Sequence, residues 1–133
     1  MPKTAYVEAY NYLELLQKAK VLRLIKSSDK KEVILTKPEK IYLINTNLHF
    51  CYCDTQEIGS IREEVFFASM FDDFNIYAPK KGDFFVNGYI FEIGGKNKTK
   101  KQIKEIENSF VVKDDIEIGS NKIIPLWLFG FLY

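Results

Sequence analysis

The chain has few of the residues from which disulfide frameworks, zinc sites and hydrolase triads are built. Its 133 residues include only two cysteines, Cys51 and Cys53, and one histidine, His49. Two cysteines this close cannot form a disulfide framework, and a structural zinc site normally takes four ligands in two separated pairs. No serine or cysteine motif around His49 indicates a catalytic triad. We therefore expect reduced cysteines, no structural zinc site and no catalytic triad.

Long apolar runs are absent as well. No stretch approaches the roughly 20 apolar residues that span a bilayer, and the first residues, with Lys3 and Glu8, lack the apolar core of a signal peptide. We therefore expect a cytoplasmic protein with no membrane partner. The formal net charge of +1 also argues against a surface that is basic throughout.

A phosphate-binding loop of the form G-x-x-x-x-G-K-[ST] is also missing. The nearest segment, residues 94–97 (GGKN), lacks both the spacing and the hydroxyl side chain that would hold Mg²⁺. The sequence therefore predicts no ATP site in this chain. ATP hydrolysis would have to come from a separate partner or from another region of a longer chain.

The sequence does contain enough apolar material for one α/β domain. Hydrophobic residues make up 47% of the chain, which suffices for a packed core at this length. Apolar residues at helical spacing predict helices over 5–19 and 60–71, and a lysine-rich helix is expected over 99–107. Short apolar runs between polar turns predict strands. These runs are 21–25, 32–35, 40–44, 74–77, 83–86, 89–92, 109–112 and 116–118.

The order of these elements predicts two parts in one compact unit. Residues 1–54, a helix followed by a hairpin, are typical of half of a winged helix. Residues 55–133 predict a mixed sheet flanked by helices, because a strand, helix and strand after Glu92 suit a crossover connection. The apolar end from Trp127 to Tyr133 either docks on this core or forms an interface with another domain or subunit.

The segment 81–96 is the most informative for function. Asp83 opens an apolar run, Asn87-Gly88 is a strong two-residue hairpin turn, and Glu92 closes a second run. Because the turn brings the strands side by side, the two carboxylates can converge near one end of the sheet. Two such groups suit Mg²⁺ or Mn²⁺, and a nearby lysine can stabilise the developing charge of a phosphate. Asp83 and Glu92 are therefore the predicted metal ligands.

A third acid lies on the predicted 60–71 helix. Glu64 shares an inward face with Ile61 and Phe71. An acid in that position is costly without a partner. Two interpretations stay open: Glu64 pairs with Arg62 or a lysine at the rim, or it completes the carboxylate cluster of the two predicted metal ligands.

Lysines surround the two acids of the hairpin. Residues 80–104 contain seven lysines and two acidic residues. Such a cluster can face the phosphate backbone of a nucleic acid, or it can keep a hairpin rim and a short helix in solution. The candidates for nucleic-acid binding are Lys80, Lys81, Lys98, Lys100, Lys101 and Lys104.

Several segments carry a resemblance to a known family. Residues 62–67 (REEVFF), 80–86 (KKGDFFV) and 89–98 (YIFEIGGKNK) resemble, in this order, the C-terminal region of a group of bacterial AAA-type ATPases. That region is a domain of unknown function with a restriction-endonuclease-like fold of the PD-(D/E)XK type. The resemblance extends to residues 12–22, 37–43 (KPEKIYL) and 124–133.

The resemblance implies a particular site. Asp83 and Glu92 would hold Mg²⁺, Glu64 would contribute from the helix, and a lysine two positions after Glu92 would orient the attacking water. Position 94 is glycine here, and the branch of the family that reads Glu-x-Gly-Gly-Lys places its lysine at Lys96. The catalytic candidates are thus Asp83, Glu92, Lys96 and Glu64, in a site that has departed from the usual pattern.

Three functional hypotheses follow. The first is an accessory C-terminal module of an AAA-type ATPase that binds DNA or a partner protein and keeps a degenerate nuclease-like site. The second is a Mg²⁺-dependent DNA nuclease. The third is a structural protein that docks on another subunit through its apolar C-terminal end.

Overall fold

The computed structural model describes residues 3–29, 38–55 and 57–132. The described chain is a mixed α/β structure, as the sequence predicts. Its elements in order are α1 (Lys3–Lys18), β1 (Leu22–Ile25), β2 (Lys40–Leu43), α2 (Thr46–Tyr52), α3 (Ile58–Met70), β3 (Ile76–Tyr77), β4 (Phe84–Val86), β5 (Tyr89–Gly94), β6 (Ser109–Lys113), β7 (Ile123–Pro125) and a 3₁₀ helix, η1 (Leu126–Phe131).

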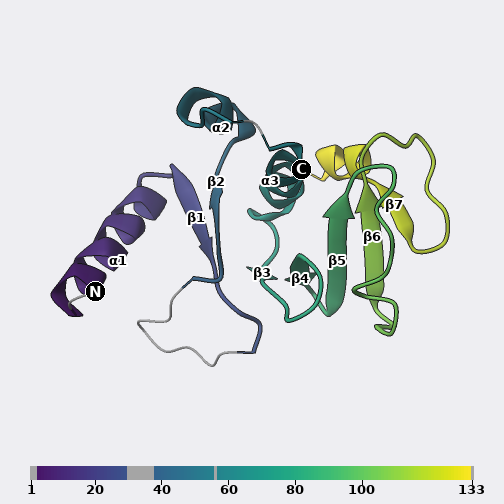
Figure 1. Ribbon diagram of the computed structural model, residues 1–133, viewed down its shortest axis with the longest axis horizontal. Coiled ribbons are helices and arrows are strands. Elements are labelled where there is room, and N and C mark those ends of the chain that lie inside the picture. Colours follow the sequence, from purple (N-terminus) through teal and green to yellow (C-terminus); the bar gives the residue numbers. More distant parts are fainter. Residues whose placement is uncertain (1–2, 30–37, 56, 133) are drawn as a thin grey trace.

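The described strands form two sheets (Figure 1). β1 and β2 make a small antiparallel pair. The larger sheet has the order β3-β4-β5-β6-β7, in which β3, β4 and β5 are antiparallel neighbours while β5, β6 and β7 run parallel. The parallel β5–β6 pair confirms the predicted crossover after the hairpin. It also places the hairpin strand β5 at the centre of the sheet.

Helix α3 lies between the two sheets, and two adjacent phenylalanines hold it there (Figure 1). Phe66 is fully buried and stacks on Phe84 of β4, with 5.1 Å between the ring centroids. Phe67 stacks on Tyr42 of β2 at 5.4 Å. Successive residues of a helix point about 100° apart, so neighbours can reach different layers. The helix therefore joins the β1–β2 pair to the main sheet in one core.

The predicted helix over 99–107 is wrong. The segment is a series of turns, in which Ile103 N donates to Lys100 O at 3.1 Å and Ile106 N donates to Ile103 O at 3.0 Å. Lys101 and Lys104 are three residues apart, and like charges at that spacing disfavour a helix. Ile103 is 2% exposed and lies close to Gly82. This one apolar side chain anchors a lysine-rich segment to the sheet.

The predicted strand over 116–118 is also wrong. Asp115 has a positive φ of 60°, which breaks an extended strand, and Ile118 is 85% exposed. The chain returns to the sheet only at β7, after which η1 buries Leu126 and Phe129. Trp127 and the other apolar side chains on the outer side of η1 are exposed. The C-terminal block thus docks on the core and keeps an apolar outer face.

Helix α1 lies beside β1, away from the main sheet (Figure 1). It confirms the predicted helix over 5–19, and Gln17 Oε1 accepts a hydrogen bond from Leu24 N at 2.9 Å. From Thr4 to Lys18 no side chain of α1 is buried. Residues 32–35, predicted to be the second strand of a hairpin, lie outside the described residues. No helix in the described part of the chain is long and apolar enough to cross a membrane.

Candidate functional site

The hairpin turn at residues 87–88 brings the two predicted metal ligands together. Both turn residues have positive φ angles, 50° and 86°, as a tight hairpin turn of the type I′ requires. In the β4–β5 register Phe84 pairs with Phe91. Asp83 precedes Phe84 and Glu92 follows Phe91, so the two acids lie opposite each other on one face of the sheet.

Two hydrogen bonds fix Asp83 against β5. Its backbone N–H donates to Phe91 O at 2.9 Å, and its carboxylate oxygen Oδ2 accepts from Ile93 N–H at 2.7 Å. Glu92, between these partners in sequence, is 1% exposed. Asp83 is therefore held against β5 by hydrogen bonds, and Glu92 is removed from solvent.

Lys98 is the charge partner of Glu92. Its Nζ lies 2.7 Å from Glu92 Oε1. Burial disfavours the charged ammonium, but the hydrogen bond to Glu92 and the charges of Glu92, Asp83 and Glu63 outweigh it and raise the pKa of Lys98 above its ordinary value. Glu92 Oε2 is buried and has no hydrogen-bond partner among the described residues.

The structure places Lys98, rather than the predicted Lys96, at the acidic pair. A Cβ on Gly94 would lie 2.6 to 2.7 Å from the Cβ, Cγ and Cδ atoms of Lys98, so the lysine stem crosses the space above this glycine. Lys96 is exposed, and its carbonyl oxygen accepts a hydrogen bond from Lys113 Nζ at 3.1 Å. The chain turns between the two lysines, and this turn directs the later one back over the sheet.

A second lysine neutralises Asp83. Lys40 Nζ, from β2, lies 3.5 Å from Asp83 Oδ1 and 3.2 Å from Glu63 Oε2. The hydroxyl of Tyr42, two residues along the same strand, donates to Glu63 Oε2. Burial, followed by this hydrogen bond, raises the pKa of Tyr42 well above its ordinary value. The acids and lysines form one cluster: Lys40, Tyr42, Glu63, Asp83, Glu92 and Lys98.

The α3 acid in this cluster is Glu63, whereas the sequence pointed to Glu64. Glu64 is 5% exposed and its Oε1 lies 3.0 Å from His49 Nδ1 of α2. Glu64 Oε2 and His49 Nε2 have no hydrogen-bond partner among the described residues. Neither open interpretation of Glu64 matches this arrangement, because its partner is a histidine of the neighbouring helix. The helical rotation between adjacent residues separates the two acids.

The lysines predicted to contact nucleic acid occupy two segments beside the sheet. Lys80 and Lys81 precede β4 and are exposed, and Lys80 pairs at 3.4 Å with Asp29. A cavity of about 470 Å³ lies next to them, and its wall includes Phe85 and Ile106. Ile106 belongs to the turn segment that carries the other lysines. These are Lys98, which points to Glu92, the half-buried Lys100, and the exposed Lys101 and Lys104.

The donor chemistry of the cluster suits Mg²⁺ only in part. Glu92 Oε2 is a buried carboxylate oxygen without a partner among the described residues, which is a suitable ligand for a hard cation. Both carboxylate oxygens of Asp83 already have partners, in Ile93 N–H and Lys40. Within the described ranges, no group of three His, Cys, Asp or Glu side chains is arranged to hold a metal ion. Three carboxylates face two ammonium groups, which leaves one negative charge.

Comparison with known proteins adds no relative. No protein-family model, curated protein or solved structure matches this chain.

Sequence reasoning did not find Lys40, Tyr42 and Glu63. Glu63 was available as the neighbour of Glu64 in the REEVFF segment, and Lys40 and Tyr42 belong to KPEKIYL. Alternation along β2 places the side chains of Lys40 and Tyr42 on one face of the strand, and this can be seen in the sequence. The sequence does not show that this face contacts α3 and β4.

Proposed function

We propose that this chain is an accessory module that binds the phosphate backbone of a nucleic acid through its lysine-rich surface. In this proposal the nuclease-like cluster is kept closed by its own ion pairs. The observation that supports it is the division of the lysines into two sets. Lys40 pairs with the half-buried Asp83 and Lys98 pairs with the buried Glu92, whereas Lys81, Lys101 and Lys104 are exposed.

The surroundings of the exposed lysines support a nucleic-acid ligand. Phosphate contacts need ammonium groups that reach solvent, and sugars or bases pack on apolar and aromatic side chains. The cavity of about 470 Å³ offers both, with Lys80 and Lys81 beside Phe85 and Ile90. The net charge of +1 is compatible with this proposal because the positive charge is concentrated locally.

The test is a titration with a short DNA duplex at several salt concentrations. Because each lysine–phosphate contact releases bound counterions, the affinity should fall steeply with salt. Replacing Lys80 and Lys81 by Gln should weaken binding and reduce the salt slope by about 2. The matched control replaces Lys18 and Lys20, two exposed lysines near the end of α1. Absence of binding at low salt, or equal effects of the two double variants, would overturn the proposal.

A Mg²⁺-dependent nuclease is the second candidate, and the unpartnered Oε2 of Glu92 favours it. In this candidate Glu92 and Asp83 would hold the metal, and Lys40 would have to leave Asp83. Bound Mg²⁺ would stabilise phosphate charge and activate water. In this candidate Lys98, whose Nζ lies 2.7 Å from Glu92 Oε1, would orient that water.

Plasmid cleavage with Mg²⁺ or Mn²⁺ separates the two candidates. A nuclease should lose activity in Asp83→Asn and Lys98→Gln and keep it in Lys96→Gln, because Lys98 contacts Glu92 whereas Lys96 is exposed. Cleavage that persists in Asp83→Asn indicates a contaminating enzyme. Salt-dependent DNA binding without cleavage supports the accessory module.

We further propose, from the resemblance to the C-terminal region of bacterial AAA-type ATPases, that ATP hydrolysis is supplied by an ATPase region or subunit. Support comes from the missing phosphate-binding loop. The coding sequence upstream tests this: an ATPase region in frame would make the chain part of a longer protein. A purely structural role through the C-terminal end predicts that removing residues 127–133 reduces the number of chains in the assembly, as measured by size-exclusion chromatography with light scattering.

A further inference from the structure

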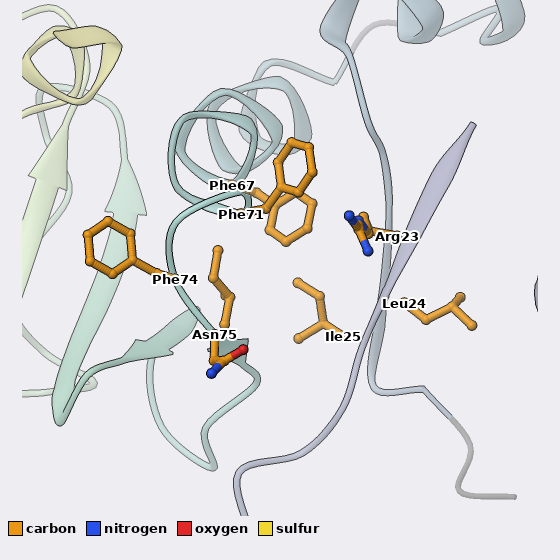
Figure 2. A pocket seen from close by; sticks show the side chains of 8 residues that line it. Arg23, Leu24, Ile25, Phe67, Phe71, Phe74 and Asn75 are labelled. Carbon is orange, nitrogen blue, oxygen red and sulfur yellow. The ribbon is translucent and has the colours of Figure 1, made fainter. Parts of the chain in front are cut away.

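A second cavity lies between β1 and the C-terminal end of α3, apart from the acidic cluster. Its volume is about 200 Å³. Figure 2 shows Arg23 and Ile25 pointing from β1 toward Phe67 and Phe71, while Leu24 points to the other side of the strand. The wall of the cavity includes Arg23, Ile25, Phe67, Phe71, Phe74 and Asn75.

Arg23 is the chemically unusual group in this wall. Its guanidinium carbon lies 4.9 Å from the centroid of the Phe71 ring, which is cation–π geometry. Its Nε is buried and has no hydrogen-bond partner among the described residues. The chain's other arginine, Arg62, differs in this respect: its Nε lies 3.0 Å from Asp114 Oδ2. Arg23 thus combines a positive charge with a buried Nε–H that has no partner among the described residues.

The rest of the wall restricts the ligand. Phe67 is buried and Phe71 and Phe74 are half-buried, and the polar side chains among the lining residues are Arg23 and Asn75. Asn75 adds one carboxamide. A cavity of about 150 Å³ is known to accept benzene, so this one has room for a ring-sized group with a small head group. Guanidinium groups bind planar carboxylates through two parallel N–H···O bonds.

We infer that this cavity binds a carboxylate carried on a small aromatic or apolar body, with the carboxylate at Arg23 and the body against the phenylalanines. The carboxylate can belong to a free small acid or to the C-terminus of a polypeptide, since both present the same planar head group. Nothing in this inference depends on the acidic cluster or on nucleic-acid binding.

The test follows the Nε–H signal of Arg23 and the side-chain amide of Asn75 by ¹H–¹⁵N NMR during titration with benzoate. We expect saturable shifts with a Kd of about 1 mM, because a ligand of this size makes few contacts. Benzamide has the same ring without the charge and should shift these signals at least about tenfold less at equal concentration. Inorganic phosphate should compete poorly, because it lacks the ring.

Two variants of Arg23 and one control variant complete the test. Arg23→Gln should weaken benzoate binding at least tenfold, and Arg23→Lys should weaken it less, because charge is kept and the two-pronged geometry is lost. Arg62→Gln is the control and should bind as the unchanged protein does. Tighter binding of a peptide that ends in a free Phe carboxylate than of its amide would assign the polypeptide source. Equal binding of benzoate and benzamide, or unchanged binding by Arg23→Gln, would overturn the inference.

Discussion

The stem of Lys98 crosses the space that a side chain at position 94 would fill, and its ammonium ends 2.7 Å from the Glu92 carboxylate. The glycine and the lysine are therefore coupled in space. The resemblance noted in the sequence implied a lysine at position 94, and in the structure the ammonium group at Glu92 comes from four residues further along. Lys98 lies beside Glu92, in the place that the resemblance assigned to Lys96.

Removing the ammonium group of Lys98 should destabilise the fold, because it leaves the charge of Glu92, which is 1% exposed, without a partner. We expect Lys98→Met to lower the free energy of unfolding by about 3 kcal/mol, as for other buried pairs that lose one partner. Adding Glu92→Gln should recover more than half of this loss. Urea unfolding of both single variants and the double variant measures the coupling. Lys96→Met is the control, with an expected change within about 0.5 kcal/mol; a larger loss there than at Lys98 would contradict the assignment.

Filling position 94 should displace the lysine. We expect Gly94→Ala to destabilise the fold by about 1 to 2 kcal/mol, because the new methyl group meets the stem of Lys98 at 2.6 Å and moves its ammonium from Glu92. Gly59→Ala is the matched control, since no atom lies within 4 Å of its added Cβ and the residue belongs to α3. It should stabilise the protein by about 0.5 kcal/mol. Equal effects of the two substitutions in urea unfolding would speak against the proposed contact.

The hydroxyl of Tyr42 should make stability depend on alkaline pH. Burial and the bond to Glu63 raise its pKa above the value of about 10 found in unfolded chains. Its contribution is therefore complete below pH 10 and is lost as the pH rises further, by about 1.4 kcal/mol per unit. Tyr42→Phe should cost about 1 kcal/mol at pH 7 and should show a shallower decline between pH 10 and 11.5. If denaturant unfolding gives the same pH dependence of stability for the unchanged protein and for Tyr42→Phe, the decline at alkaline pH does not come from Tyr42.

The turn segment before β6 should depend on a single apolar anchor. Ile103 is 2% exposed, so Ile103→Ala should lower the free energy of unfolding by about 3 kcal/mol. Hydrogen exchange at residues 98–104 should accelerate in the same variant, because the anchor holds the segment that carries Lys98. Ile118→Ala offers the same chemical change at a site that is 85% exposed, where about 0.5 kcal/mol or less is expected. Unchanged exchange in Ile103→Ala would show that other contacts hold the segment.

Local patterns were sufficient to predict much of the main sheet. The Asn-Gly turn, the alternation on both sides of it and the strand after Ser109 correspond to β4, β5 and β6. Each depends on neighbours in sequence, through turn geometry and period-two alternation. The same reasoning failed over 99–107, because lysines three apart repel each other in a helix and the tertiary contact of Ile103 holds turns instead.

The amino-acid sequence by itself determined that Asp83 and Glu92 would meet, because a two-residue turn sets the register of the strands that flank it. Only the tertiary structure decided which ammonium groups would reach them. Lysine side chains are long and flexible, so a shift of two positions in a turn selects Lys98 over Lys96, and strand packing adds Lys40 from 43 residues away. Adjacent helical residues diverge by about 100°, and the position of α3 between two sheets therefore assigned Glu63 to the cluster and Glu64 to His49.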